Sequence, residues 1–93
     1  MPLDGEVIRM KMTQLGSVWQ LVDDCMLRAE FERGSFHDAI LFVQNIGNAA
    51  EEADHHPDIH IYYSKVVIEL TTHGAGGLTE RDFALAKKIE TLH

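Results

Sequence analysis

The sequence holds few of the features that would mark a disulfide-stabilised, membrane-spanning or secreted protein. Its one cysteine, Cys25, allows no internal disulfide, and a zinc site built from several thiolates is excluded. The longest apolar run, around residues 39–43, is far too short to cross a bilayer. The opening MPLDGEVIRMKM lacks the basic start and apolar run of a secretory signal. We therefore expect one domain over residues 1–93, in a reducing, cytoplasmic compartment.

Positive charge is also scarce. The chain has 8 basic and 15 acidic residues, which gives a formal net charge of −7. The basic residues are scattered, and only Lys87 and Lys88 are adjacent. A surface of this kind repels a phosphate backbone and an anionic membrane, so we expect no direct binding to nucleic acid or membranes. A chain of 93 residues builds only a modest core, which makes a self-association surface a reasonable expectation.

Hydrophobic spacing predicts a helix in the middle of the chain. Ser35 can cap its start, with Asp38 at the capping-box position. Pro57 bounds its far end, because the residue before proline avoids helical geometry. Apolar residues recur at three- and four-residue steps, which is typical of a buried helix face. They are Phe36, Ala39, Ile40, Val43, Ile46, Ala50 and Ala53.

Strands are expected on both sides of this helix. Residues 19–22 and 27–31 form one predicted pair, and residues 58–63 and 65–72 form a second. Thr79 and Asp82 match a capping box that starts a last helix. A weaker pattern over residues 6–15 allows a leading helix. The order predicts an α+β fold, a two-layer sandwich in which helices pack on one face of a four-stranded antiparallel sheet.

Three of the six histidines lie in the run DHHPDIH, at residues 54–60. They could be polar residues in a loop, metal ligands or acid/base groups. A metal site needs ligands that converge at roughly 2 Å from one ion, and adjacent histidines usually diverge on an extended chain. His55 and His60 with Asp58 would make only a weak site, so we expect no metal.

Acid/base chemistry is the third interpretation, because an imidazole gives and takes protons near neutrality. His73 would end the strand at 65–72, just before a glycine turn, on the sheet face opposite the apolar one. If His55 lies near that strand end, several imidazoles would converge on a pocket open to solvent. Asp82, one turn into the last helix, could orient one of them. Pattern alone leaves this pocket and the plain loop both open.

The spacing resembles the signature of the pterin-4a-carbinolamine dehydratase family. Glu51 is followed by His55-His56-Pro57 and then, at set intervals, by Tyr63, His73 and Asp82. The stretches AEEADHHPD, YSKVVIELTTH and GGLTERDFALAKKIE also look like that family. The similarity runs from about residue 31 to residue 89. It implies the two-layer α+β fold that the hydrophobic pattern predicts.

The resemblance implies an enzyme that removes water from 4a-hydroxytetrahydropterin, giving quinonoid dihydropterin in tetrahydrobiopterin recycling. It implies no metal or organic cofactor. His55 and His73 would form the acid/base pair, and Asp82 would support them. His56 would chiefly hold the pterin while belonging to the same catalytic set. Substrate-binding residues would be Glu51, His56, Pro57, Tyr63 and Thr72.

The resemblance also implies partners. Family members form homodimers or homotetramers and serve an aromatic amino acid hydroxylase in the same pathway. Animal members act as dimerisation cofactors of a homeodomain transcription factor, so a non-catalytic module that binds a protein partner is the alternative function. Two positions depart from the family pattern: Ile59 replaces a frequent aromatic residue, and Arg33 replaces a usual phenylalanine.

Overall fold

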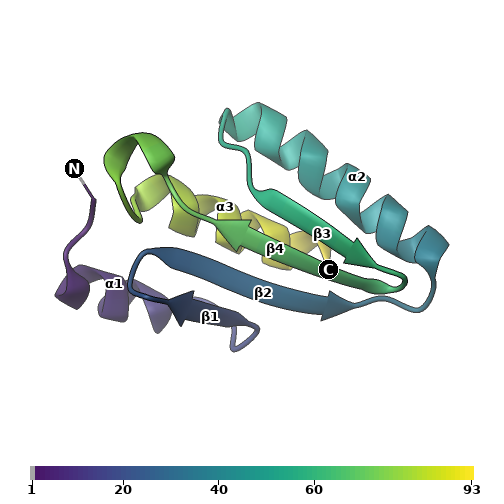
Figure 1. The fold of residues 1–93 in the computed structure, drawn as a ribbon, viewed down its shortest axis with the longest axis horizontal. Helices are drawn as coiled ribbons and strands as arrows, with labels where there is room; N and C mark the ends of the chain where they lie inside the picture. Colours follow the sequence, from purple (N-terminus) through teal and green to yellow (C-terminus); the bar gives the residue numbers. More distant parts are fainter. Residues whose placement is uncertain (1) are drawn as a thin grey trace.

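The computed structural model describes residues 2–93 and confirms the expected α+β fold, including the leading helix. The elements run in the order α1 (Gly5–Met12), β1 (Trp19–Val22), β2 (Met26–Glu32), α2 (Phe36–Ala53), β3 (Asp58–Tyr62), β4 (Lys65–Leu70), the 3-10 turn η1 (His73–Ala75) and α3 (Glu80–Leu92) (Figure 1). None of the helices in this part of the chain has the length and apolar composition needed to cross a membrane.

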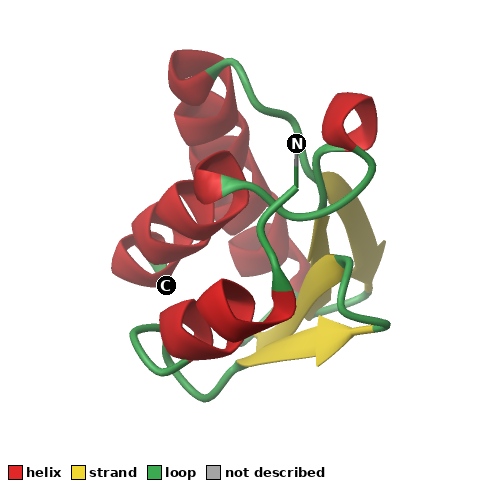
Figure 2. Cartoon of the chain, turned by 90° about the vertical axis from the view of Figure 1, so that its left-hand side faces the viewer, coloured by secondary structure: helices red, strands yellow, loops and turns green. Residues whose placement is uncertain are grey.

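The four strands form one antiparallel sheet in the order β1-β2-β4-β3. Ala29 of β2 pairs with Ile68 of β4, which pairs with Ile59 of β3. These three side chains share one face, because residues directly opposite in a sheet point the same way. The helices lie on that side of the sheet, and the other side is open (Figure 2).

The open face is polar, as expected for a sheet covered on one side. Arg28 lies opposite Glu69, and Glu32 lies opposite Lys65. Val67 is an apolar residue at the centre of this face, and it is nevertheless buried. It lies between Glu30 and His60 on the neighbouring strands.

The core lies between the sheet and the helices. Leu27 and Phe31 of β2, with Ile68 and Leu70 of β4, are almost completely buried. Phe31 meets Phe42 of α2 in an edge contact, with ring centroids 5.0 Å apart. In α3 the buried residues include Phe83, Ala86 and Ile89. These contacts join α2, the sheet and α3 in one hydrophobic cluster.

The predicted buried face of α2 was partly wrong. Phe36 and Ile40 are exposed, at 51% and 39% of their surface, and Ala53 is exposed too. Phe42 and Ala49 are buried in their place. The periodicity was right, but α2 packs against both β4 and α3, which rotates its buried side toward Phe42. Phe36 and Ile40 therefore point away from the core.

The second hairpin is shorter than expected. β4 ends at Leu70, and Thr72 makes an isolated bridge with Gly77. The Thr72 carbonyl accepts hydrogen bonds from the backbone of Ala75 and Gly76, which turns the chain. His73 therefore begins the turn η1, and the prediction that it ends a strand is wrong.

Candidate active site

The end of α2 fixes the backbone at His55. Asp54 adopts the left-handed conformation, with φ 49° and ψ 44°. Its backbone N–H donates to the Glu51 carbonyl, and the His55 N–H donates to the Ala50 carbonyl at 3.1 Å. This pair of bonds is the Schellman arrangement, which satisfies carbonyls that the helix leaves free. His55 is thus held at a set position directly after the helix.

The start of α3 fixes Asp82. Thr79 caps the helix, and its hydroxyl accepts from the backbone N–H of Arg81 at 3.3 Å. The Thr79 backbone N–H donates to Asp82 Oδ2 at 2.9 Å, which completes the capping box. Asp82 is fully buried, at 0% exposure. The capping prediction is confirmed, and the same bonds hold the carboxylate in the protein interior.

His55 and Asp82 meet across these two helix ends. His55 Nε2 lies 2.6 Å from Asp82 Oδ1, and only 7% of the His55 surface is exposed. Thr72, just after β4, donates to Asp82 Oδ2 at 2.7 Å. Three segments far apart in the sequence therefore join in one buried cluster. A carboxylate bound to one ring nitrogen sets the orientation of an imidazole and leaves its second nitrogen for other chemistry.

His56 and Glu51 form a separate, exposed pair beside this cluster. His56 Nε2 lies 3.5 Å from Glu51 Oε2, and both side chains are largely exposed. Pro57 follows directly and is half-buried before β3 begins. The two adjacent histidines thus diverge: His55 turns into the protein and His56 turns to solvent.

His73 and Tyr63 take different positions relative to the cluster. His73 is exposed and follows Thr72 directly, so it lies one residue from the group that bonds Asp82. Tyr63 lies in the turn between β3 and β4, with a positive φ of 56°. His55 precedes β3 and Tyr63 follows it, so the two residues lie at opposite ends of that strand (Figure 1). The fold does not bring Tyr63 to the cluster within one chain.

Arg81 is a residue that the sequence pattern missed. Its guanidinium donates to the Asp54 carbonyl and, at 3.5 Å, to the Ala53 carbonyl. It therefore joins the start of α3 to the end of α2. A cation in the first turn of a helix is unfavourable for that helix, whereas it is favourable at a C-terminus. The unfavourable charge at residue 81 was the available signal for a contact with another helix end.

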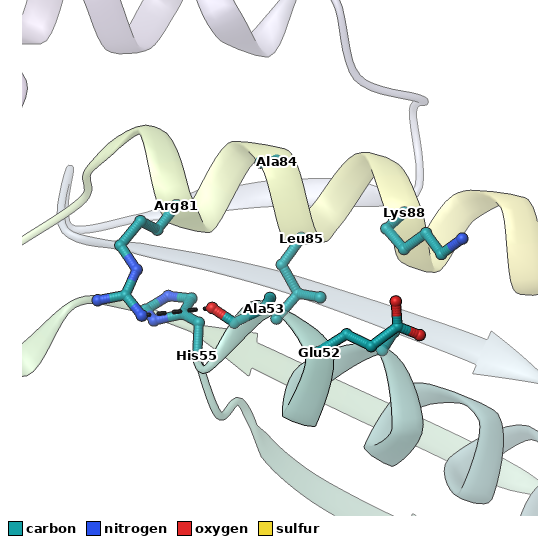
Figure 3. A pocket seen from close by; sticks show the side chains of 8 residues that line it. Glu52, Ala53, His55, Arg81, Ala84, Leu85 and Lys88 are labelled. Carbon is teal, nitrogen blue, oxygen red and sulfur yellow. Dashed lines mark hydrogen bonds between the residues drawn. The ribbon is translucent and has the colours of Figure 1, made fainter.

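A cavity of about 450 Å³ opens between α2 and α3 (Figure 3). Small and apolar side chains line it, together with Glu52 from α2 and with Arg81 and Lys88 from α3. His55 is the only predicted site residue among its lining. The volume suits a small molecule. Within residues 2–93, no three His, Cys, Asp or Glu side chains are grouped so that they could hold a metal ion.

Together the sheet, the helices and the His55–Asp82–Thr72 cluster define a small α+β protein with an oriented, buried imidazole. The chain belongs to the family described as pterin 4 alpha carbinolamine dehydratase, whose profile matches residues 1–92. A relative from Sulfolobus acidocaldarius is 40% identical over 92 residues, covering 99% of each chain. One from Picosynechococcus is 50% identical over 74 residues, covering 80% of this chain and 79% of its own. Both carry pterin-4-alpha-carbinolamine dehydratase in their names.

Two solved structures share the fold. A transcriptional coactivator/pterin dehydratase from Brucella melitensis matches with a TM-score of 0.91 and 29% identity, over 99% of this chain and 98% of its own. A pterin dehydratase-like protein, described as a RuBisCO assembly factor in the alpha-carboxysome, matches with a TM-score of 0.65 and 27% identity. That match covers 80% of this chain and 84% of the other.

Proposed function

We propose that this protein dehydrates 4a-hydroxytetrahydropterin to quinonoid dihydropterin by general acid/base catalysis with histidines. Membership of the dehydratase family supports the reaction. The observation that carries the proposal for this chain is the buried bond between His55 and Asp82, which holds an imidazole in one orientation. In the family's setting the reaction would serve tetrahydrobiopterin recycling in the cytoplasm, beside an aromatic amino acid hydroxylase.

The chemistry needs two proton transfers. The C4a hydroxyl leaves as water once it is protonated, and a ring N–H of the pterin gives up a proton, so the pterin loses one water in total. His55 and His73 are the proposed acid/base pair, and an imidazole can serve either step near neutral pH. Asp82 contributes by orienting His55, because its carboxylate is fully buried and its oxygens are bonded to His55, Thr72 and the Thr79 backbone.

The exposed residues would bind the substrate. His56 and Glu51 lie together at the solvent side of the helix end, where they could contact the edge of a pterin. Pro57 stays a proposed contact beside them. Thr72 is proposed as a substrate-binding residue through its methyl group, since its hydroxyl is bonded to Asp82 and its backbone N–H and carbonyl are bonded within the turn that follows. Tyr63 could take part only in a neighbouring copy of the chain.

Purified protein should accelerate the decay of the 4a-carbinolamine, measured by absorbance in a stopped-flow instrument. The double variant His55→Ala/His73→Ala should lose this acceleration. The matched control is His37→Ala/His60→Ala, which removes two exposed histidines outside the cluster and should keep wild-type rates. Full activity in the first double variant would end the assignment of these two residues.

A second function, binding of a protein partner, is favoured by the exposed apolar side of α2. Phe36 and Ile40 lie one turn apart, and half-buried Val43 continues the row. We define these three residues as the α2 apolar row. No charged side chain belongs to it, so the row fits an identical row on a second copy despite the net charge of −7. We propose that the α2 apolar row forms the contact of a homodimer or homotetramer. The alternative is the coactivator-type function, in which the row binds another protein. A pull-down that returned another protein in stoichiometric amount, together with an absence of dehydratase activity, would favour that alternative.

A further inference from the structure

A chain of hydrogen-bonded side chains lies beneath His55. Asp82 Oδ1 bonds His55 Nε2 at 2.6 Å, and Asp82 Oδ2 bonds the Thr72 hydroxyl at 2.7 Å. Thr72 Oγ1 in turn lies 2.9 Å from Thr79 Oγ1. Asp82 is completely buried, and Thr72 and Thr79 are half-buried. The four side chains come from the end of α2, the end of β4 and the capping box of α3.

The donors along this chain follow from the number of protons available. An ionised carboxylate only accepts, and a hydroxyl carries one proton. The Thr72 hydroxyl donates its hydrogen to Asp82, so its oxygen must accept from Thr79 in the bond between the two threonines. Thr79 is free to donate, since its oxygen accepts the Arg81 backbone N–H. The direction is therefore fixed: Thr79 donates to Thr72, and Thr72 donates to Asp82.

The same reasoning fixes the proton on His55. Asp82, as an ionised carboxylate, accepts at Oδ2 from Thr72 and from the Thr79 backbone, and its Oδ1 lies 2.6 Å from His55 Nε2. His55 Nε2 must then carry the hydrogen, and in the neutral ring Nδ1 holds a lone pair. Nδ1 is the nitrogen left to exchange a proton with a substrate.

We propose that Thr79 is a positioning residue, which acts through Thr72 and Asp82 to hold His55 in the Nε2–H tautomer. The proposal gives the capping box of α3 a second task beyond starting the helix. It rests on the proposed function only where catalytic effects are concerned, because the tautomer of His55 is a property of the protein alone. Without the Thr79 hydroxyl, the Thr72 hydroxyl loses the donor that fixes its direction, and the Thr79 backbone N–H is then the one fixed donor left at Asp82 Oδ2.

The first test reads the tautomer directly. In protein labelled with ¹⁵N-histidine, the nitrogen shifts of His55 should show one neutral tautomer with the proton on Nε2; the His55→Gln variant assigns the signals. Thr72→Val and Thr79→Ala should each give mixed or exchange-broadened signals. Thr79→Ser keeps the hydroxyl and should restore the wild-type spectrum. A proton on Nδ1 in the wild-type protein would overturn the proposal, whatever the activity.

The second test measures catalysis with 4a-hydroxytetrahydropterin. Thr79→Ala should lower kcat about 3- to 10-fold with little change in KM, the loss expected for one hydrogen bond, and Thr79→Ser should recover it. The matched control is Ser35→Ala at the start of α2, since Ser35 caps that helix through the Asp38 N–H at 3.1 Å and touches no site residue. Both alanine variants should lower Tm by similar amounts.

The outcomes separate the two proposals. Equal kcat values and unchanged His55 signals in Thr79→Ala and Ser35→Ala would show that Thr79 is only a helix cap. A wild-type protein without dehydratase activity would end the proposed function, while the ¹⁵N spectra would still decide the role of Thr79. If Thr79→Ala does not fold, Thr72→Val breaks the same bond between the two threonines from the segment after β4, where no helix cap is lost.

Discussion

Glu30 lies on the open face of the sheet, close to two cations. Arg28 Nη1 donates to its Oε2 at 2.7 Å, and Lys65 Nζ lies 3.7 Å from its Oε1. The Arg28 hydrogen bond, followed by the Lys65 charge, lowers the pKa of Glu30 below its ordinary value of 4.5. A carboxylate whose pKa is lower in the folded state binds fewer protons there than in the unfolded chain. Its contribution to stability is therefore present above pH 4.5 and is lost as the pH falls through the folded-state pKa.

The prediction concerns Glu30→Gln. Its free energy of unfolding should fall slightly short of the wild-type value near neutral pH, and the difference should shrink below pH 4.5. The effect is small, because the pair is exposed, and added salt should reduce it further. Urea unfolding at a series of pH values measures it. Glu52→Gln is the control, since Glu52 forms no ion pair within residues 2–93; a deficit that grew in acid would contradict the prediction.

The sequence predicted the positions of some site residues and missed the contacts of others. The capping-box pattern located Asp82 in the first turn of a helix, and the family spacing paired it with His55. The bond of Thr79 to Thr72 depends on how α3 meets the segment after β4, and the bonds of Arg81 depend on how α3 meets the end of α2. No local pattern encodes either arrangement. Tyr63 fits the spacing too, but a spacing does not say which end of a hairpin a residue occupies.

At the scale of elements, the end of α2 depends on Asp54. A non-glycine residue in the left-handed region is strained, and glycine is the usual residue at this position of a Schellman arrangement. Asp54→Gly should therefore raise the free energy of unfolding by about 0.5–1 kcal/mol, whereas Asp54→Ala should lower it by about 1 kcal/mol. Chemical denaturation distinguishes the two signs.

A glycine in an extended strand gives the comparison for this variant. Asp58→Gly removes the same side chain from β3 and should lower stability by about 0.5 kcal/mol, since glycine gains freedom in the unfolded chain and relieves no strain there. If both glycine variants destabilised the protein, the left-handed conformation of Asp54 would not be a source of strain.

The boundaries of α2 and β4 show which structural features can be predicted from local sequence patterns. The helix over Phe36–Ala53 was predicted in full, because a cap, an apolar period and a proline all agreed. β4 was predicted two residues too long, since Thr71 and Thr72 suit a strand by composition. The Thr72–Gly77 bridge ends the strand instead, and that bridge depends on a six-residue loop closing on itself. Likewise, which side of α2 is buried was decided by its contact with α3.

At the scale of the whole molecule, the α2 apolar row is an apolar part of the surface that a monomer would leave in water. Phe36 and Ile40 are exposed at 51% and 39%. Fully burying one such side chain is worth about 1.5–3 kcal/mol, so losing even part of that contact from each copy should weaken self-association at least ~10-fold. Phe36→Gln/Ile40→Gln should therefore shift the protein toward monomer, as measured by sedimentation equilibrium. Both changes are neutral, so the charge of the protein stays the same.

The control variant is Met10→Gln, which replaces an apolar residue on α1 that is 65% exposed and lies outside the row. It should leave the association constant unchanged. The net charge of −7 on each copy opposes association, so the wild-type constant should rise with salt as the repulsion is screened, whereas the apolar contact itself does not weaken. A protein that sediments as a monomer at every salt concentration, or a double variant that associates as tightly as the wild type, would contradict the proposed contact between copies.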